Sequence, residues 1–233
     1  MKIGLFGYGK MGKMIAQMAR NRGHEITCIV DQPNEEMNFT TVDIVIDFSS
    51  PDAAFQNISN SFKAGVPVVS GTTGWLERYD EACAMCKSKS GGFIYASNFS
   101  LGVNLFFALN VQLAKLMSGA PGYTTTLEEI HHTQKLDAPS GTAITLAEGI
   151  VANSSYSGWL ADQQEPGILP ILSKRVGETP GTHKVQYQSE VDSIEIIHTA
   201  HNREGFAMGA VLAAEWLIDK KGVFDMSDVL NLR

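Results

Sequence analysis

The 233-residue sequence has few cysteines, no long apolar run and no excess of positive charge. The three cysteines, Cys28, Cys83 and Cys86, cannot all pair, and no second cysteine pair or nearby histidine completes a zinc site around Cys83 and Cys86. We therefore expect reduced thiols and a cytoplasmic protein. The apolar runs are too short to span a bilayer. The net charge of −7 argues against nucleic acid or a membrane as partner, because both need a basic face.

The first hundred residues alternate short β-branched runs with stretches of helical spacing. Strands are predicted at 2–6, 25–30, 43–47, 66–70 and 93–96, with helices at 11–20, 51–64 and 75–87. Short strands that alternate with helices of this length are typical of parallel β–α–β units in a doubly wound sheet.

The order of elements changes after residue 100. Ser100 can cap a long helix with an apolar stripe at Leu105, Leu109, Leu113 and Leu116. Further elements are predicted as strands at 124–130, 184–189 and 193–199, and as helices at 140–152 and 207–217. The sequence thus predicts an α/β protein with a Rossmann-type domain over 1–104, completed by about 208–233, and a second, α+β domain over 105–207.

A glycine-rich turn follows the first predicted strand. Gly7-Tyr8-Gly9-Lys10-Met11-Gly12 has the G-x-G-x-x-G spacing, in which the glycines allow a tight turn, close approach of a pyrophosphate and close helix–strand packing. Asp31 stands at the end of the second predicted strand, where a carboxylate can accept hydrogen bonds from adenosine ribose hydroxyls. We predict a dinucleotide site; the structural alternative is a plain strand–helix turn with a surface aspartate.

The charge near Asp31 favours NADH as the cofactor. The carboxylate would repel a 2′-phosphate, and the next residue, Gln32, supplies no cation. NADPH stays possible because Lys10, Arg20 or Arg22 could reach the phosphate.

Two later segments follow predicted strands, where ligands of open α/β sheets bind. Gly71-Thr72-Thr73-Gly74 offers hydroxyls and amides, and Ala96-Ser97-Asn98-Phe99 offers an amide and an aromatic wall. An ordinary turn explains either segment equally well. The segment 47–51 is interpreted as a strand end with a capping serine.

The densest cluster of chemically active residues lies at 129–143. His131 can deliver a proton near neutral pH, and Lys135 can stabilise developing negative charge. The amides of Ser140, Gly141 and Thr142, at a predicted helix start, can hold a carboxylate. A metal site is disfavoured, because His131 and His132 point to opposite faces of a strand and further ligands cannot be placed. A solvated polar loop is the alternative.

This segment, Glu-Ile-His-His-Thr-Gln-Lys-Leu-Asp-Ala-Pro-Ser-Gly-Thr-Ala, resembles the signature of the 4-hydroxy-tetrahydrodipicolinate (dihydrodipicolinate) reductase family. Segments 7–12, 71–74 and 98–104 resemble the family as well. So do Arg175-x-Gly177-x-x-x-Gly181-x-His183 and Ala200-x-x-Arg203-x-Gly205-Phe206-Ala207, so the resemblance runs through nearly the whole chain.

The resemblance implies a reductase of a small cyclic dicarboxylate in lysine and diaminopimelate biosynthesis, with hydride transfer from the nicotinamide to ring carbon C4. It implies His131 as general acid/base, Lys135 as proton donor or charge stabiliser, and His132, Lys135, Ser140, Gly141 and Thr142 as substrate-binding residues. It implies a cofactor groove lined by Gly7, Gly9, Lys10, Met11, Gly12, Asp31, Gly71, Thr72, Thr73, Ala96, Ser97, Asn98 and Phe99. It also implies a homotetramer assembled through the second domain.

The chain departs from the family in two ways: the connection from Val30 to Asp43 is short, and the residue after Asp31 is not basic. Two rival functions stay open, an aspartate-type amino-acid dehydrogenase with the same two-domain plan and a dinucleotide-sensing module without turnover. The first rival predicts turnover of aspartate. The second predicts NADH binding alone, and it gives no reason for His131 and Lys135 to lie together.

Overall fold

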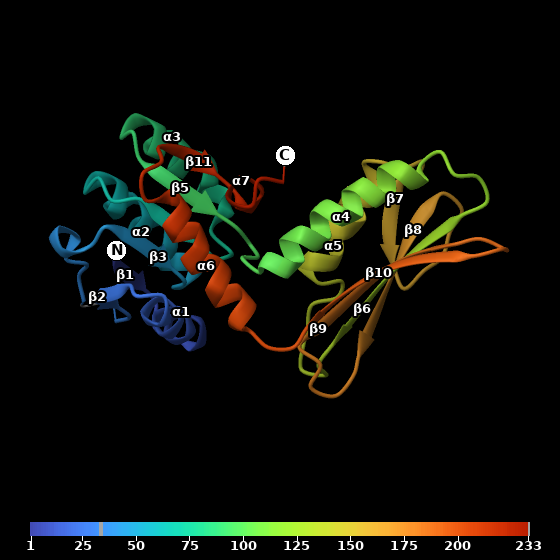
Figure 1. Ribbon diagram of the computed structural model, residues 1–233, viewed down its shortest axis with the longest axis horizontal. Helices are drawn as coiled ribbons and strands as arrows, with labels where there is room; N and C mark the ends of the chain where they lie inside the picture. The colour runs from blue at the N-terminus through green and yellow to red at the C-terminus, as the bar shows by residue number, and fades with distance from the viewer. Residues whose placement is uncertain (33–34, 233) are drawn as a thin grey trace. The chain divides into compact units, whose positions relative to one another are not determined.

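The computed structural model describes residues 1–32 and 35–232. The chain divides into two compact units, one formed by Met1–Leu101 with Glu204–Arg233 and the other by Gly102–Arg203. Each unit has its own sheet (Figure 1) and its own apolar core. Within the described residues, no helix has the length and apolarity needed to cross a membrane.

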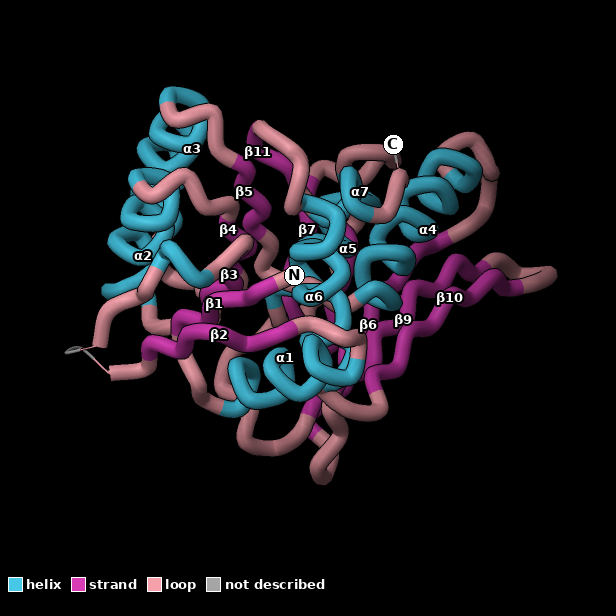
Figure 2. The backbone as a smooth tube through the Cα atoms, turned by 60° about the vertical axis from the view of Figure 1, so that its left-hand side comes forward, coloured by secondary structure: helices cyan, strands magenta, loops and turns pink. Residues whose placement is uncertain are grey.

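The first unit contains a six-stranded sheet in the order β11-β5-β4-β3-β1-β2, and every strand pairing in it is parallel. The strands are β1 (Lys2–Phe6), β2 (Glu25–Val30), β3 (Ile44–Asp47), β4 (Val68–Ser70), β5 (Gly92–Tyr95) and β11 (Gly222–Phe224). From β1 the chain first runs to the edge strand β2 and then returns to β3 on the other side of β1 (Figure 2). The carboxyl ends of β1 and β3 therefore form the switch point at which such sheets bind ligands.

Helices cover both faces of this sheet. One core joins the sheet to α1 (Lys10–Asn21) and α6 (Glu204–Leu217), and it is closed by the short α7 (Met226–Val229). The other core joins the sheet to α2 (Pro51–Lys63) and α3 (Tyr79–Ser88). Two short 3₁₀ turns, Phe39–Thr41 and Leu76–Arg78, lie in the connections. Strands buried on both sides explain the nearly continuous apolar runs in the sequence.

The second unit contains a five-stranded mixed sheet in the order β10-β9-β6-β8-β7, with α4 (Leu101–Met117) and α5 (Gly141–Val151) packed on one face (Figure 1). The strands are β6 (Thr124–His131), β7 (Gly158–Ala161), β8 (Ile168–Arg175), β9 (Gly181–Gln188) and β10 (Ser193–Ala200). The central strand β6 is antiparallel to β9 and parallel to β8. Its side chains alternate between buried and half-buried along most of its length, as expected for a sheet covered on one face.

The predicted fold, a Rossmann-type doubly wound sheet with a second α+β domain, is confirmed. Three strands were not predicted: β7, β8 and β11. β8 contains Pro170, which counts against a strand in a sequence, and β7 and β11 are too short to show a period. The leucine stripe of α4 is also not its buried face. Leu105, Leu109 and Leu116 are exposed in the single chain, whereas Val103, Phe106, Asn110 and Ala114 are buried.

Candidate active site

The turn after β1 has glycine at positions where a side chain would collide with the backbone. Gly7 has φ +86°, and a Cβ there would lie 2.2 Å from the carbonyl oxygen of Phe48. A Cβ on Gly12 would lie 2.2 Å from the carbonyl oxygen of Gly7. Both positions therefore require glycine, the first for its backbone conformation and its contact with β3, and the second for the packing of α1 against the turn.

Gly9 differs from these two glycines, because nothing lies within 4 Å of the place a Cβ would occupy. It is the N-cap of α1, has no side-chain capping bond and is followed by a first turn without an acidic residue. The first amides of a helix have no partner inside it and attract an anion. The free space at Gly9 thus fits a pyrophosphate that approaches the backbone closely.

Two pockets adjoin this turn and share Gly9, Phe48 and Ser49 in their walls. The Asp31 pocket, with a volume of about 550 Å³, is lined by Gly7 and by three polar residues that follow β2, Asp31, Gln32 and Glu35. The Thr72 pocket, with a volume of about 480 Å³, also contains Lys10, Met11, Gly71, Thr72 and Thr73. Together they have room for the two halves of a dinucleotide on either side of Gly9.

Two carboxylates stand in the Asp31 pocket. Oδ1 of Asp31 accepts a hydrogen bond from the backbone N–H of Tyr8 at 2.6 Å. Glu35, which the sequence reading did not single out, accepts from the N–H groups of Asp31 and Gln32 at 2.7 and 2.9 Å. These backbone hydrogen bonds lower the pKa of Glu35. Among the described residues that line this pocket there is no Lys or Arg.

A buried carboxylate supports the wall that the two pockets share. Asp47, fully buried at the end of β3, accepts hydrogen bonds from Ser49, Ser70, Thr72 and Asn57 at 2.6, 2.9, 2.8 and 3.2 Å. Burial raises its pKa, against the effect of these bonds. The sequence reading treated this strand end as structural first. The structure shows that Asp47 ties together the ends of β3 and β4, from which Ser49 and Thr72 reach the pockets.

Ala96, Ser97, Asn98 and Phe99, which were expected in the cofactor groove, follow β5 and line neither pocket. Phe99 is only 2% exposed, and its ring packs against Phe48 with the ring centroids 5.7 Å apart. The aromatic residue that the two pocket walls share is Phe48 itself. Gly12 is buried behind the turn.

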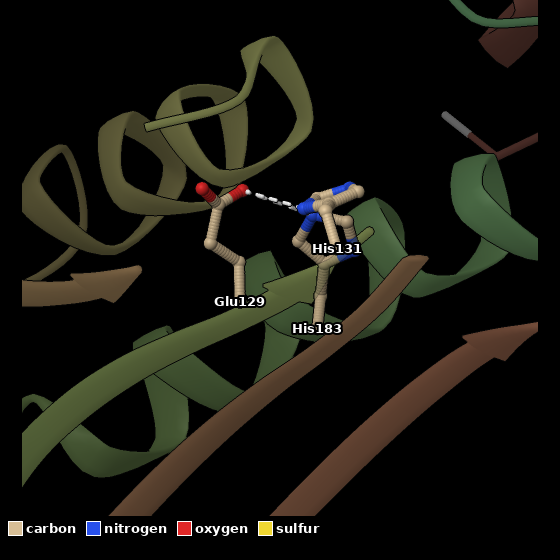
Figure 3. Close-up of side chains that lie close together, drawn as sticks. All are labelled: Glu129, His131 and His183. Atoms are coloured by element: carbon tan, nitrogen blue, oxygen red, sulfur yellow. Dashed lines mark ion pairs between the residues drawn. The ribbon is translucent and has the colours of Figure 1, made fainter. Parts of the chain in front are cut away.

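The catalytic candidates lie in the second unit, where the buried face of β6 becomes polar. Leu127, Glu129 and His131 follow one another along this face, and all three are buried. Glu129 stands in register with Ser173 of β8 on one side and with His183 of β9 on the other. Figure 3 shows the carboxylate of Glu129 directed toward the two imidazoles.

Glu129 is the centre of a hydrogen-bonded group that we call the Glu129 cluster: Glu129, His131, Ser140, Ser173, Arg175 and His183. Oε1 accepts from Ser140 N at 3.2 Å, Ser173 Oγ at 2.9 Å and Arg175 Nη2 at 3.3 Å. Oε2 accepts from Ser140 N at 3.1 Å and lies 3.3 Å from His131 Nδ1 and 3.7 Å from His183 Nε2. Burial raises the pKa of Glu129, but these partners together lower it. The carboxylate is therefore ionised.

The loop after β6 carries the other candidates. Lys135 Nζ bonds both carboxylate oxygens of Asp137 at 2.7 and 2.6 Å, and Arg175 holds the loop through the carbonyl oxygens of Lys135 and Asp137. Ser140 is the N-cap of α5, and its Oγ accepts from Ala143 N. Gly141 is exposed and Thr142 half-buried at this helix start, and His132 is half-buried beside buried His131. The structure thus brings His131, Lys135 and the start of α5 into one region of the second unit. The Ser140 N–H, which was expected to hold a substrate carboxylate, instead donates to Glu129.

His183 and Glu129 are cluster members to which the sequence reading gave no role, although both stood in the quoted motifs. Glu129, His131 and His183 also have ligand atoms within 4.8 Å of one another, a spacing that can hold a metal ion. An ion there would displace donors from a carboxylate that already accepts several hydrogen bonds, and it would stand beside the Arg175 guanidinium. The donor set therefore fits a hydrogen-bonded cluster better than a metal centre.

A glycine cradle at the switch point of a parallel sheet defines a pyridine-nucleotide-binding protein of the Rossmann type. Residues 1–99 match the model for the N-terminus of dihydrodipicolinate reductase, and residues 102–230 match the model for its C-terminus. The chain belongs to the dihydrodipicolinate reductase family and is an oxidoreductase.

Curated relatives agree with the family models. The 4-hydroxy-tetrahydrodipicolinate reductase of Christiangramia forsetii is 53% identical, over 99% of this chain and 98% of that protein. The enzyme of the same name from Ralstonia pickettii is 32% identical, and the match covers both chains completely.

Solved structures share the fold. A dihydrodipicolinate reductase from Paenisporosarcina sp. TG-14 with bound dipicolinate has a TM-score of 0.77 at 23% identity, covering 96% of this chain and 97% of that one. An aspartate dehydrogenase from Thermotoga maritima has a TM-score of 0.51 at 13% identity, covering 96% and 99%. At these identities the likeness concerns the fold alone.

Proposed function

We propose that this oxidoreductase reduces 4-hydroxy-tetrahydrodipicolinate (dihydrodipicolinate) to tetrahydrodipicolinate in lysine and diaminopimelate biosynthesis. The observation that carries the proposal is the link between the acid/base candidate and the anion cradle. Glu129 contacts His131 through Oε2 and accepts a hydrogen bond from Ser140 N, the N-cap of α5. One buried side chain thus contacts both the proposed proton donor and the helix start proposed to bind a substrate carboxylate, which supports reduction of a ring dicarboxylate.

The substrate carboxylates are bound by the start of α5 and by the loop before it. One carboxylate accepts from the amide of Gly141 and the hydroxyl of Thr142. Lys135 and His132 hold the ring dicarboxylate from the loop. Asp137 pairs with the ammonium group of Lys135, and a substrate carboxylate takes the place of this internal one.

When bound, the nicotinamide supplies a hydride to ring carbon C4. The 4-hydroxyl group of the substrate leaves as water, and the resulting dihydrodipicolinate takes up the hydride at C4 and one proton from His131. The imidazole later takes up a proton from water. Lys135 stabilises the negative charge that develops on the substrate as the hydride arrives, and serves as a second proton donor. Burial of His131, which is 7% exposed, keeps water away from the transferred proton.

The cofactor groove consists of the Asp31 and Thr72 pockets, and we propose NADH as the preferred cofactor. The adenosine ribose hydroxyls are held by Asp31. A 2′-phosphate would meet two carboxylates, Asp31 and Glu35. The N–H groups of residues 31 and 32, which could donate to such a phosphate, already donate to Glu35. Like charges within the pocket therefore disfavour NADPH.

We further propose a homotetramer assembled through the second unit, working in the cytoplasm. The exposed apolar side chains of this unit include Leu105, Leu109 and Leu116 on α4 and Ile194 and Ile197 on β10. Burial of such side chains between copies would remove apolar surface from water. Light scattering after size-exclusion chromatography measures the mass of the assembly; a monomer at micromolar concentration would contradict the proposal.

The test of the reaction follows nicotinamide absorbance with freshly prepared 4-hydroxy-tetrahydrodipicolinate and, separately, with aspartate and NAD⁺. We expect oxidation of NADH with the first and no turnover with the second. Turnover of aspartate alone would identify an amino-acid dehydrogenase, and NADH binding without any turnover would identify a sensor.

Pyridine-2,6-dicarboxylate tests the cradle directly. The Paenisporosarcina relative binds dipicolinate, and we expect this chain to bind it in competition with substrate. Thr142→Val keeps the side-chain shape and deletes the hydroxyl, so it should weaken dipicolinate and raise KM together, by about tenfold for one lost hydrogen bond to a charged group. Calorimetric titration of the native chain and the variant makes the comparison, and equal affinities would place the substrate elsewhere.

A further inference from the structure

The proposed reaction uses His131 and the helix start, but it leaves two buried ionisable residues of the same cluster without a task. Glu129 is completely buried and His183 is 5% exposed. A buried charge is costly unless its neighbours require it. The side chains that meet this carboxylate come from β6, β8 and β9, and the start of α5 adds the backbone N–H of Ser140. Partners from four separate elements indicate a role beyond the stability of any one strand.

Both oxygens of Glu129 accept from the backbone N–H of Ser140, but their side-chain partners differ. Oε1 accepts from Ser173 Oγ at 2.9 Å and from Arg175 Nη2 at 3.3 Å, and both groups are donors toward it. Oε2 instead faces His131 Nδ1 at 3.3 Å. Nδ1 is buried and has no hydrogen-bond partner among the described residues, and this carboxylate oxygen lies within ion-pairing distance of it. A carboxylate accepts only, and it therefore keeps a proton on Nδ1.

His183 completes the arrangement from β9. Its Nε2 lies 3.2 Å from Ser140 Oγ and 3.7 Å from Glu129 Oε2, and its ring meets the His131 ring edge-to-face with centroids 5.1 Å apart. Burial lowers the pKa of His183, and the charge of His131 acts in the same direction, against the raising effect of Glu129. A neutral His183 can hold Glu129 and Ser140 in place without a second positive charge beside His131.

We propose that Glu129 is a positioning residue for the proton transfer: it fixes His131 as the Nδ1–H tautomer, so that Nε2 is the atom that gives and takes the catalytic proton. His183 is the second positioning residue, because its Nε2 pairs with Ser140 Oγ, the cap of α5, and its ring lies beside both Glu129 and His131. The inference deepens the proposed function and rests on His131 being the general acid.

Glu129→Gln is the decisive variant because the two carboxylate oxygens have different side-chain neighbours. The glutamine carbonyl takes the Oε1 position, where Ser173 and Arg175 donate, and its NH₂ group then faces His131 Nδ1. Nδ1 must accept from this group, so the proton moves to Nε2. We expect the ¹⁵N chemical shifts of His131 to report an Nδ1–H ring in the native chain and an Nε2–H ring in Glu129→Gln. We also expect kcat to fall by on the order of 10²-fold with little change in KM.

Three further variants distinguish a positioning role of these residues from a contribution to protein stability alone. Glu128→Gln is the matched control: it lies next to Glu129 on β6, pairs with Lys174 outside the cluster and should change neither the tautomer nor kcat. Glu129→Asp keeps the charge at a greater distance, should retain the Nδ1–H tautomer and should recover part of kcat. Glu129→Asp also tests the proposal if Glu129→Gln does not fold. His183→Leu should raise KM more than it lowers kcat, because it releases the Ser140 cap.

The outcomes are distinguishable. If Glu129→Gln retains the native tautomer and rate while His131→Ala is inactive, the positioning role is wrong and the proposed function stands. If His131→Ala itself turns over normally, the proposed acid is wrong. If a chelator abolishes activity and added Zn²⁺ restores it, Glu129, His131 and His183 are metal ligands, and the positioning role is overturned.

Discussion

At the end of β1 the protein leaves a space by having no side chain at Gly9, whereas at the end of β6 it fills the space with Glu129 and His131. The first region uses backbone amides and glycines within one short segment. The second uses buried charged and polar side chains from strands that are far apart in the sequence. A site made of backbone recognises a shape and an anion, and a site made of ionisable side chains can hold and move a proton. This difference is the reason that we propose nucleotide binding for the first region and acid/base chemistry for the second.

The largest expected effect that separates the two regions is a loss of turnover without a loss of cofactor affinity. His131→Ala and Lys135→Ala should each lower kcat by roughly 10²–10⁴-fold, because a positioned acid or a fixed charge is removed. NADH affinity should change little, because the proposed nucleotide groove is formed by residues of the first unit alone. Steady-state kinetics and NADH titration measure the two quantities. Near-normal turnover in either variant would show that the residue has no such role.

The glycines of the first region should divide into structural and ligand-facing positions. Gly7→Ala forces a methyl group against Phe48 at a positive φ, and we expect a loss of about 1–3 kcal/mol or more in the free energy of unfolding. Gly9→Ala points into open space, so it should cost less than about 1 kcal/mol and weaken NADH instead. Urea unfolding together with NADH titration makes the comparison. Equal stability losses would contradict it.

Cofactor choice should respond to the charges at the end of β2. Gln32→Arg combined with Glu35→Gln places a cation in the Asp31 pocket and removes one of its two negative charges. We expect the ratio of kcat/KM for NADPH over NADH to rise by about tenfold, which corresponds to roughly 1.4 kcal/mol. Measurement of both cofactors at one ionic strength tests it. A native chain that strongly prefers NADPH would contradict the role given to the two carboxylates.

The smallest effect is the dependence of stability on pH. The lowered pKa of buried His183 means that the unfolded chain takes up a proton at a pH where the folded chain does not. Stability should therefore fall as the pH drops below about 6.5, the ordinary histidine value. His183→Gln should lose less stability between pH 7 and pH 5 than the native chain, and His201→Gln, at an exposed position, should behave as native. Identical losses in all three would contradict the assignment.

The same contrast explains what could be predicted from the sequence. The Gly7–Gly12 turn and Asp31 could be singled out because their spacing is local. Gly7 and Gly12 are required sterically, and Gly9 leaves open space. The α5 start was found because Ser140 carries its own capping signal. The Glu129 cluster was not assembled in advance, since β8 was missed at Pro170 and the register that sets Ser173 and His183 beside Glu129 is a long-range property. Glu35 was missed because its bonds depend on the shape of the short connection after β2.

The central claim is most directly tested by following a label from cofactor to product. The native chain is mixed with NADH that carries deuterium at both C4 positions of the nicotinamide and with fresh 4-hydroxy-tetrahydrodipicolinate, and the product is examined by NMR. We predict one deuterium at ring carbon C4 of tetrahydrodipicolinate, and no labelled product from His131→Ala on the same timescale. Deuterium at another carbon, or labelled product at the native rate from His131→Ala, would contradict the account.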